Sequence, residues 1–379
     1  MTSIVRAAVA SEIRKTEIRE FLMPEVEPDS GLLRVETTGV CGSDWPFYLS
    51  MPKVKGPLIL GHETVGIVEK LGAGKKWAVK EGDRVALEEY IPCGQCHYCY
   101  TGDFRLCEQT DLKFGALRYG LMPVTKEPHL WGGFSQYQHL HANTVFHKIP
   151  SNVPAAQAAL ALPLGNGVEW AYLQGGAKVG DTVVIQGPGQ QGLACVIAAK
   201  EAGAACIIVT GLGNPTDTFR LRIARELGAH HTINVEEKDP LEAVSEITNR
   251  EMADVVIDAA SGGPWTVSLA IHLARKKGRV ILCGQKQARV PEFDSDILSA
   301  RFLTVKGMRG HSYQAVALAV EIISSGRHRL DLMSTHQFGL NEMDEALRTV
   351  GGEGRPNPIH CTVNPWLWAD INSGGKVCR

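Results

Sequence analysis

The chain has 379 residues, 44% of them hydrophobic and 21% charged, with a formal net charge of −2. This length favours two domains over one, and the near-neutral charge argues against nucleic acid or an anionic membrane as the main partner. The longest apolar stretch, residues 155–164, is too short to span a bilayer, and the N-terminal residues lack the apolar core of a secretory signal. We therefore expect a globular, cytoplasmic protein in which the cysteines stay reduced.

The first part of the chain, up to about residue 150, reads as short strands separated by turns. Apolar or alternating runs at residues 35–40, 65–70 and 84–87 are bounded by glycine, proline or aspartate. Such a pattern predicts a mainly-β domain.

Four cysteines follow these strands within fifteen residues, with two, two and seven residues between them. They are Cys93, Cys96, Cys99 and Cys107. The short gaps let successive thiolates converge on one ion, and the longer gap lets the chain return to close the shell. Four thiolates without an open position indicate a structural zinc site. The alternatives are four unrelated cysteines and an iron–sulfur cluster, although ferredoxin-type clusters use other spacings.

Beyond Pro154 the pattern changes to buried strands alternating with helices. We expect strands at residues 181–186, 206–210, 255–258 and 280–283, and helices at 193–202, 218–227 and 313–325. This alternation predicts a parallel sheet covered on both faces. From about Met308 onward the sequence no longer alternates regularly between strand and helix patterns, and residues 367–379 have the composition of a polar tail.

A glycine-rich loop connects the first of these strands to its helix. It reads Gly187-Pro188-Gly189-Gln190-Gln191-Gly192, and this context is the one that a dinucleotide-binding loop requires. The glycines would allow a tight turn, a close approach of the pyrophosphate and close helix–strand packing, with the phosphates at the helix N-terminus. The alternative is a glycine-rich turn without a ligand.

The end of the second strand of this domain bears on the choice between NAD and NADP. At Thr210-Gly211 there is no carboxylate to accept the ribose hydroxyls. Thr210, Arg220 and Arg222 could instead bind a 2′-phosphate, because arginine suits phosphate. We expect NADP, with NAD as the alternative, since Asp217 could reach the ribose and both arginines could lie on a solvated helix face.

Five motifs follow one another along the chain: Gly39-Val40-Cys41-Gly42-Ser43-Asp44, Gly61-His62-Glu63, the four-cysteine lobe, Gly132-Gly133-Phe134-Ser135-Gln136-Tyr137 and the glycine loop. Taken together and in this order, they resemble the zinc-dependent medium-chain dehydrogenase/reductase family, which includes alcohol dehydrogenases. The resemblance covers essentially the whole chain. It implies an α/β protein with a GroES-like mainly-β catalytic domain and a Rossmann domain with a doubly wound parallel sheet. The expected domains are 1–163, 164–306 for the NAD(P)-binding domain, and a return to the catalytic domain in 307–379.

By this resemblance, Cys41 and His62 bind a second, catalytic zinc. Ser43 matches the hydroxyl that relays the alcohol proton, Glu63 matches a carboxylate that can exchange as a metal ligand, and Asp44 matches the acid that orients His62. Zinc would polarise a carbonyl or acidify an alcohol, and hydride would move between the carbinol carbon and the nicotinamide.

Two positions depart from the family pattern. Leu162 stands where the family has a third metal ligand, and Pro46 stands where many members have a relay histidine. Zinc could therefore be held by Cys41, His62 and Glu63 or Asp44, or the third ligand could be Asn166 or Glu169. Alternatively, the catalytic zinc is absent and the protein is a zinc-independent 1,4-reductase of activated C=C bonds.

We expect a zinc-dependent, NAD(P)-linked alcohol dehydrogenase or aldehyde or ketone reductase that acts on a small molecule. A non-catalytic dinucleotide-binding protein is the alternative outside enzymes. Family analogy implies a homodimer or homotetramer, with an edge strand near residues 280–283 as the contact. The aromatic residues that follow Ser43 either line an apolar pocket or pack a loop; they are Trp45, Phe47 and Tyr48. Residues 110–131 are a candidate lid over such a pocket. Glu89 could hydrogen-bond a polar substrate.

Overall fold

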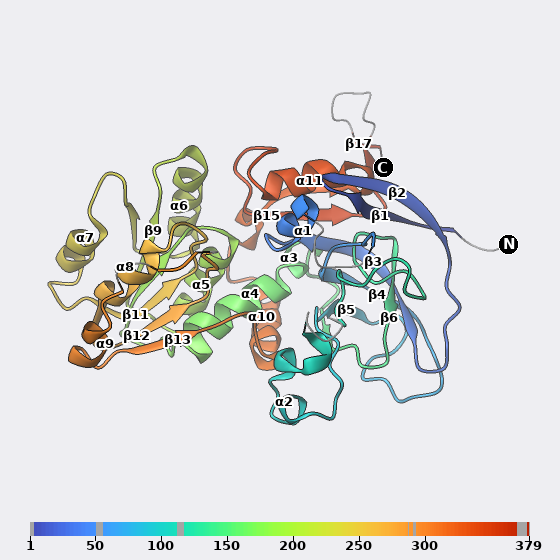
Figure 1. The fold of residues 1–379 in the computed structure, drawn as a ribbon, viewed down its shortest axis with the longest axis horizontal. Helices are drawn as coiled ribbons and strands as arrows, with labels where there is room; N and C mark the ends of the chain where they lie inside the picture. The colour runs from blue at the N-terminus through green and yellow to red at the C-terminus, as the bar shows by residue number, and fades with distance from the viewer. Residues whose placement is uncertain are drawn as a thin grey trace. The chain divides into compact units, whose positions relative to one another are not determined.

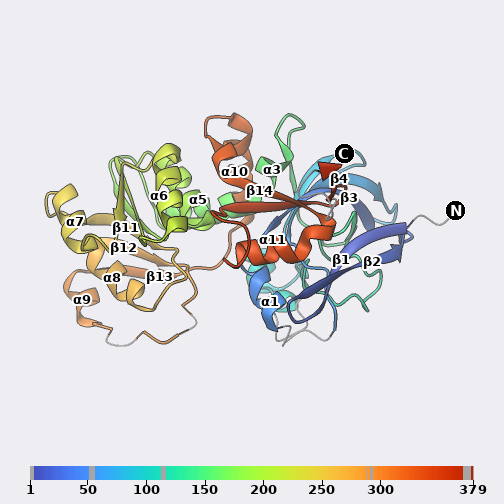
Figure 2. The ribbon, with the colours of Figure 1, turned by 90° about the horizontal axis from the view of Figure 1, so that it is seen from above.

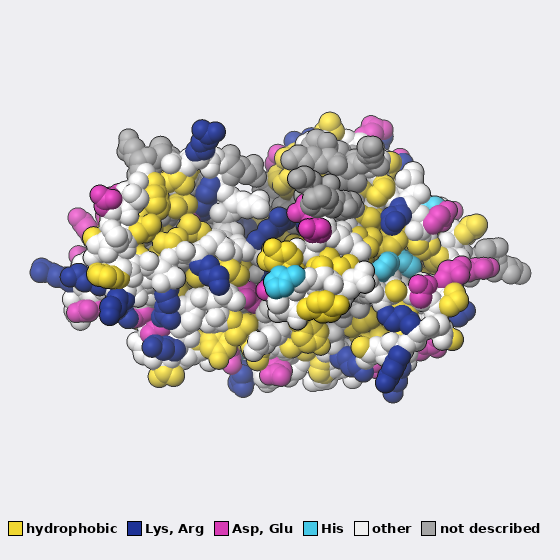
Figure 3. Space-filling model, turned by 60° about the horizontal axis from the view of Figure 1, so that its bottom comes forward, with side chains coloured by type: hydrophobic (Ala, Val, Ile, Leu, Met, Phe, Trp, Pro, Cys, Tyr) yellow, Lys and Arg dark blue, Asp and Glu magenta, His cyan; other side chains and the backbone are white. Residues whose placement is uncertain are grey.

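The computed structural model describes residues 4–50, 56–111, 117–286, 288–290, 293–369 and 377–378. The chain divides into two compact units, Met1–Ala161 with Ser334–Arg379, and Leu162–Met333. Among the described residues, no helix has the length and apolar character needed to cross a membrane. On the face that Figure 3 shows, lysine and arginine side chains lie interspersed with acidic, apolar and neutral ones.

The first unit is built around a seven-stranded sheet, in which all the neighbours pair antiparallel except the first two. Its strands are β3 (Gly31–Val40), β4 (Glu63–Leu71), β5 (Arg84–Leu87), β6 (Tyr137–Leu140), β7 (Phe146–Lys148), β14 (Ser334–Gly339) and β15 (His360–Asn364). The order is β14-β15-β3-β4-β5-β7, and β6 also pairs with β3. Figure 1 labels β15, β3, β4, β5 and β6 of this sheet. The expected mainly-β domain is therefore confirmed.

Smaller elements complete the first unit. They are the hairpin of β1 (Ile4–Glu12) and β2 (Lys15–Leu22), the helices α1 (Asp44–Ser50), α2 (His97–Tyr100), α3 (Ala155–Ala158) and α11 (Met343–Val350), and the short pair β16 (Trp368–Ala369) and β17 (Val377–Cys378). Helix α11 packs against β15 and α1. The apolar sequence pattern of β3 accounts for the packing, since Leu33 and Val35 on one face of the strand are fully buried in a core cluster.

The second unit holds a six-stranded, fully parallel sheet. Its strands are β8 (Thr182–Gln186), β9 (Cys206–Gly211), β10 (His231–Asn234), β11 (Ala253–Asp258), β12 (Ala274–Leu282) and β13 (Thr304–Gly307). The order β10-β9-β8-β11-β12-β13 runs outward in both directions from β8 and β11, which is the doubly wound arrangement that the sequence predicts.

Helices cover both faces of this parallel sheet. The α-helices of this unit are α4 (Ala161–Gly167), which leads the chain into it, α5 (Gln190–Glu201), α6 (Pro215–Leu227), α7 (Pro240–Ile247), α8 (Trp265–Leu273), α9 (Asp296–Ala300) and α10 (Tyr313–Ser325), of which α5, α6 and α8 pack on the strands. Helices α5 and α6 pack on β8, β9 and β10 from one face, and α8 packs on β11 and β12 from the other (Figure 2). Right-handed crossovers account for the two layers, because the strand order reverses direction at β8.

Local sequence signals set the helix ends. Helix α6 begins after Asn214, whose side chain accepts the backbone N–H of Asp217 at 2.9 Å, and it ends at Gly228 with φ 126°. The expected end of this helix at Gly228 is confirmed. Its start lies three residues earlier than residue 218, because Pro215 occupies the first helical position.

Some sequence expectations differ from the structure. The strand near residues 280–283 is not an edge strand, since β12 lies between β11 and β13, and β13 forms the edge. The described residues 117–131 do not form a lid, because Tyr119, Met122 and Trp131 are buried in a core cluster; residues 112–116 of the expected lid, Phe114 among them, lie outside the described residues. The compact units divide at residues 161/162 and 333/334, whereas the three-part division at 163 and 306 stays a prediction.

Candidate active site and metal centres

Three side chains with metal-ligand chemistry meet in the first unit. Cys41 follows β3 directly, His62 precedes β4 and Glu63 begins it, and the two strands pair so that Gly39 lies opposite Glu63. One donor atom from each of Cys41, His62 and Glu63 lies within 4.8 Å of the other two. A thiolate, an imidazole and a carboxylate form a donor set that suits Zn²⁺. The structure thus brings together the three residues that the resemblance places at a catalytic metal.

Asp44 fixes the position of two of these side chains. Its carboxylate is buried, and one oxygen accepts the backbone N–H of Cys41 at 3.0 Å. The other oxygen lies 3.4 Å from Nδ1 of His62. An imidazole held at Nδ1 directs Nε2 toward a metal, and a carboxylate partner also raises its basicity as a ligand. On the Nε2 side, the Ser43 hydroxyl lies 3.4 Å away.

Glu63 faces a histidine that the sequence does not connect with it. His360 begins β15 and is fully buried, and its Nε2 lies 3.6 Å from Oε2 of Glu63. Among the described residues, neither ring nitrogen of His360 nor Oε2 of Glu63 has a hydrogen-bond partner. A Cβ at Gly39 would fall 2.1 Å from Oε2 of Glu63, so only glycine leaves room for this carboxylate. A buried carboxylate oxygen without a hydrogen bond fits a metal ligand, because burying a charge is costly unless it is paired.

The electrostatics of the cluster also favour a cation. Burial, followed by the negative charge of Glu63, raises the pKa of the Cys41 thiol. Burial by itself lowers the pKa of His62, but the negative charges of Asp44 and Glu89 raise it well above its usual value. Metal binding requires a thiolate and a neutral imidazole, so a divalent cation would replace protons at this cluster.

The third-ligand candidates of the second unit are already engaged there. Leu162 is buried and has no donor atom. The side-chain oxygen of Asn166 lies 2.9 Å from Nδ1 of His311. Oε2 of Glu169 accepts both the backbone N–H and the hydroxyl of Ser312. These bonds hold the start of α10, which gives Asn166 and Glu169 structural roles and favours Glu63 as the third ligand.

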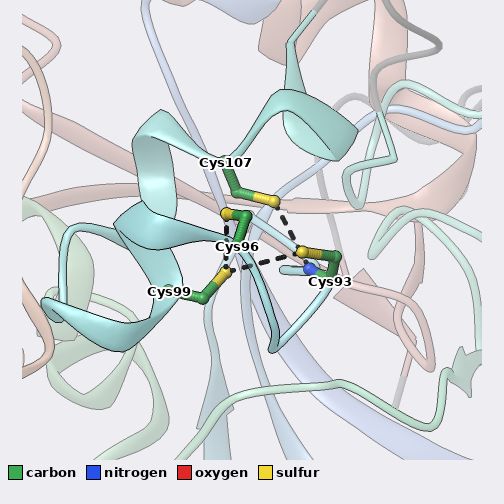
Figure 4. A group of neighbouring side chains, drawn as sticks. All are labelled: Cys93, Cys96, Cys99 and Cys107. Atoms are coloured by element: carbon green, nitrogen blue, oxygen red, sulfur yellow. Dashed lines mark hydrogen bonds between the residues drawn. The ribbon is translucent and has the colours of Figure 1, made fainter.

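The four-cysteine lobe gathers its sulfurs around one point (Figure 4). All four sulfurs lie within 4.8 Å of one another, with Cys96 to Cys99 at 3.5 Å and Cys93 to Cys99 at 3.9 Å. In a tetrahedral site with Zn–S bonds of about 2.3 Å, the sulfurs would lie about 3.8 Å apart. The backbone N–H of Gln95 and its neighbours lower the pKa of Cys93 to about 7, whereas burial raises the pKa of Cys99 to about 12. The spacing of the sulfurs thus fits a structural zinc ion.

The glycine loop of the second unit has the shape of a phosphate cradle. Gly187 has φ 92°, and a Cβ at Gly192 would fall 1.9 Å from the carbonyl oxygen of Gly187, so both positions require glycine. A Cβ at Gly189 would meet nothing within 4 Å, so this residue faces open space at the first turn of α5. Buried polar atoms of Gln190 and Gln191 lack hydrogen-bond partners among the described residues. Free helix N–H groups, open space and unsatisfied amides together fit a bound pyrophosphate.

At the end of β9 the structure brings together groups of both charges. Thr210 is buried, and Oδ2 of Asp217 accepts the backbone N–H of Leu212 at 3.0 Å. Arg220 lies 3.6 Å from Asp217. Arg222 instead places its guanidinium over its neighbour Phe219 at 5.3 Å on the helix surface. A 2′-phosphate would therefore depend on Arg220, and the ribose hydroxyls could meet Asp217.

The residues expected in a substrate pocket divide into two groups. Trp45 packs on Tyr48 with ring centroids 5.6 Å apart, and Tyr48 donates its hydroxyl to the carbonyl of Arg14 at 2.7 Å. Trp45 and Phe47 both pack against a core cluster that includes Tyr48, which supports loop packing for these aromatic residues. Glu89, in contrast, remains partly exposed, with its side chain 20% accessible.

Comparisons with known proteins agree with this geometry. The family model "Alcohol dehydrogenase GroES-like domain" matches residues 27–151, and "Zinc-binding dehydrogenase" matches residues 192–325. A Mycobacterium tuberculosis protein named "Probable alcohol dehydrogenase adh" is 36% identical over 369 residues, covering 96% of this chain and 99% of the relative. L-threonine 3-dehydrogenase of Pyrococcus abyssi is 31% identical over 340 residues, covering 88% and 91%.

Solved structures show the same fold. A zinc-binding dehydrogenase from Sinorhizobium meliloti, bound to NADP, superposes with a TM-score of 0.82 at 27% identity, covering 96% of this chain and all of that one. Alcohol dehydrogenase TADH from Thermus sp. ATN1 gives a TM-score of 0.82 at 27% identity, covering 95% and 99%. With the two metal clusters and the phosphate cradle, these matches show that the chain belongs to the zinc-dependent medium-chain dehydrogenase/reductase family and is an NAD(P)-dependent oxidoreductase of the alcohol dehydrogenase type.

Proposed function

We propose that this protein interconverts an alcohol and the corresponding aldehyde or ketone, using a zinc ion held by Cys41, His62 and Glu63. The observation that carries this proposal is the convergence of these three donors beside the Ser43 hydroxyl. The relatives named alcohol and L-threonine dehydrogenase support the reaction class. A bound zinc would supply electrophilic polarisation of the substrate oxygen, and NAD(P) would exchange the hydride.

The side chains of this cluster divide the remaining tasks. Asp44 holds His62 and the backbone of Cys41, so that both donors face the same point. Ser43 would accept the proton of the alcohol and return it in the reverse direction, and the position of its hydroxyl 3.4 Å from Nε2 of His62 supports this role. Pro46 has no group that could pass that proton on, so the proton would have to leave Ser43 by another route, such as water. His360 lies behind the Glu63 carboxylate and limits where it can turn.

The second unit would bind the cofactor at the glycine loop and the loop after β9. Gln190, Gln191 and Gly192 offer backbone N–H groups to the pyrophosphate at the start of α5. Arg220 favours the 2′-phosphate of NADP, whereas Asp217 favours the free hydroxyls of NAD. Gly211→Asp would be a poor test of this preference, because a Cβ there would fall 2.9 Å from the Pro188 ring. Replacing Arg220 tests it without that clash.

A zinc-free reductase of activated C=C bonds is the second candidate, and Leu162 is the observation that favours it. The deciding measurement is zinc per chain, by elemental mass spectrometry on protein purified without chelators. About two zinc ions per chain, with oxidation of alcohols by NAD(P)⁺, would support the proposal. About one zinc ion per chain, without alcohol oxidation, would overturn it and assign the metal to the four-cysteine lobe.

A further inference from the structure

A hollow of about 760 Å³ lies in the second unit, at the edge of the parallel sheet where its strands β11 and β12 begin. Its walls come from five segments: helix α7, the end of α8, the turn before β11, the start of β12 and the residue that follows α9. Figure 1 and Figure 2 both show α7, α8 and α9 close together. Segments that are distant in the sequence thus meet around one space.

This hollow is separate from the glycine loop. Strand β11 begins at Ala253, opposite Ala274 of β12, and ends at Asp258, opposite Gln186. Gln186 directly precedes the glycine loop, so the loop and the hollow lie at opposite ends of β11, roughly 17 Å apart at 3.3 Å per residue. Cofactors of parallel sheets bind at the carboxyl ends of the strands. The hollow therefore lies outside the site that the dinucleotide would use.

Positive charge predominates in this space, which we call the basic hollow, although the whole chain has a net charge of −2. Among the described residues, neither Arg250 nor Lys276 has an ion-pair partner, and both side chains are exposed. Unpaired cations in a concave site attract anions. The cationic residues of the basic hollow are Arg250, Arg275, Lys276 and Arg301, and its carboxylates are Glu242 and Glu251.

Two of the arginines are held in place by contacts with the protein. Nη1 of Arg301 donates to the carbonyl oxygens of His272 at 3.1 Å and Ala274 at 3.2 Å. Nε of Arg275 pairs with the carboxylate of Asp254. A guanidinium has five N–H donors, so each arginine keeps donors for a ligand. Because these planar groups are already fixed, they lose little freedom on binding, and their fork geometry suits a phosphate.

The loops around the basic hollow adopt a conformation that side chains rarely take. Arg250 and Met252, which line it, have φ 71° and 66°, and their neighbour Asn249 has φ 49°. Lys277 has φ 59° and Phe302 has φ 55°, and each follows a residue of the lining. These five are among the eight non-glycine residues with positive φ in the described part of the chain. Such backbone strain costs free energy and concentrates at ligand-binding sites.

The other residues of the basic hollow supply hydrogen-bond acceptors and apolar surface. Nδ1 of His272 donates to a backbone carbonyl one turn earlier at 2.8 Å, which leaves Nε2 of the neutral ring as an acceptor. The carboxylates of Glu242 and Glu251 also only accept. Leu241 and Met252 add apolar contact and pack on a core cluster. A matching ligand has an anionic group, hydroxyl donors and a carbon skeleton.

We propose that the basic hollow binds a phosphorylated sugar. Its phosphate lies among the four cationic side chains, and its hydroxyls donate to the carboxylates and to His272. The volume of about 760 Å³ is in the usual range for small-molecule sites. A free sugar phosphate and the ribose phosphate of a nucleotide share this chemistry. The site lies apart from the metal cluster and the glycine loop, so the inference does not depend on the proposed function.

The test measures ligand binding by isothermal titration calorimetry on the full-length, zinc-loaded protein. Saturating NADPH or NADH fills the cofactor site first. The probes are ribose 5-phosphate, adenosine 5′-monophosphate, ribose and inorganic phosphate. The variants are Arg250→Gln and Lys276→Gln, which remove exposed cations without ion pairs and should keep the wild-type melting temperature. The matched control is Arg329→Gln, an exposed arginine of the same unit that pairs with Asp331 outside the basic hollow.

We expect one ribose 5-phosphate to bind per chain and to raise the melting temperature of the wild type. Its Kd should increase about tenfold or more in Arg250→Gln and in Lys276→Gln, as for the loss of a hydrogen bond to a charged group, and stay unchanged in Arg329→Gln. Ribose and inorganic phosphate should each bind at least about tenfold more weakly, because each keeps only part of the contacts. Tighter binding of adenosine 5′-monophosphate would identify a nucleotide as the source, and weaker binding a free sugar phosphate.

Three results would overturn the inference. The first is no saturable binding of ribose 5-phosphate or adenosine 5′-monophosphate at millimolar concentrations. The second is the same Kd in the wild type and in both variants of the basic hollow, which would place any binding elsewhere. The third is binding of ribose or of inorganic phosphate as tight as that of ribose 5-phosphate, which would exclude a site for a phosphorylated sugar.

Discussion

Replacing Asp44 by asparagine should release the catalytic zinc and leave the structural one in place. Asp44 is buried and holds two partners at once, the backbone N–H of Cys41 at 3.0 Å and Nδ1 of His62 at 3.4 Å. Asparagine keeps the shape but has one acceptor oxygen, so one of these two donors would face the amide NH₂ group. That donor loses its hydrogen bond, and His62 also loses the charge that raises its basicity.

The expected loss follows from these contacts. Mutating an outer partner of a metal ligand typically costs about 10- to 100-fold in metal affinity, or about 1.4–2.7 kcal/mol. The assay is a zinc count per chain after dialysis against graded chelator concentrations. The wild-type protein should lose the second of its two zinc ions at a certain chelator concentration. Asp44→Asn should lose that ion at a chelator concentration 10- to 100-fold lower.

A matched control is Asp103→Asn, which removes an exposed carboxylate whose hydrogen bond comes from the Thr101 hydroxyl. It should release zinc as wild type does. If Asp44→Asn retained its second zinc ion at the wild-type chelator concentration while keeping a wild-type melting temperature, the assignment of the metal to Cys41 and His62 would be refuted.

Four further perturbations test other parts of the molecule. Cys96→Ser should lower the zinc count by one and the melting temperature by several degrees, because structural zinc binding is coupled to folding; an unchanged count would contradict the lobe assignment. Arg220→Gln should lower kcat/KM with NADP about tenfold relative to NAD, and equal losses with both cofactors would reject its role at the 2′-phosphate. Gly192→Ala should lower the free energy of unfolding by about 1–3 kcal/mol in chemical denaturation, because the new Cβ would fall 1.9 Å from a carbonyl oxygen. Gly189→Ala should keep wild-type stability, because its Cβ would meet no atom within 4 Å, but it should weaken cofactor binding. Burial lowers the pKa of His139 from 6.5 to about 4, and the charge of a neighbouring histidine contributes to this shift. Between these two pH values the imidazole therefore binds a proton in the unfolded chain but not in the folded one. Stability should therefore be lost as the pH falls below 6.5, by about 2 kcal/mol at pH 5, and a His139→Phe variant that kept the same pH dependence would contradict this origin.

Features encoded in short stretches of sequence could be predicted. The cysteine spacing predicted a cluster whose sulfurs do converge, and the alternation of strands and helices predicted the parallel sheet of the second unit. The glycine loop could be placed because its neighbours, a buried strand and a helix start, are adjacent in the chain. In each case the signal lies in a short stretch of chain, fifteen residues for the cysteines, six for the glycine loop and one element at a time for the strands and helices, so local patterns suffice.

Contacts between distant segments could not be predicted in the same way. His360 reaches Glu63 because β15 pairs with β3, with Thr362 opposite Gly39, and no motif links these segments. The pair of Glu89 and Arg118 depends on a chain segment that returns to pair beside Tyr90. For the aromatic residues after Ser43 the sequence left a pocket lining and loop packing equally open, because composition alone cannot distinguish the two; the structure packs them against a core cluster.

An irregularity in β3 shows how the fold sets the geometry of the metal cluster. The register between β3 and β4 shifts by one residue between Val35 and Thr37, after which Gly39 lies opposite Glu63. A shift of one residue moves every following side chain to the other face of the sheet, so without it Thr38 would lie opposite Glu63. Thr38 carries a Cβ, whereas Gly39 leaves the space that the Glu63 carboxylate occupies. The bulge and the glycine therefore act together: the bulge selects which residue faces Glu63, and the missing side chain lets its carboxylate lie between His360 and the two other donors, Cys41 and His62.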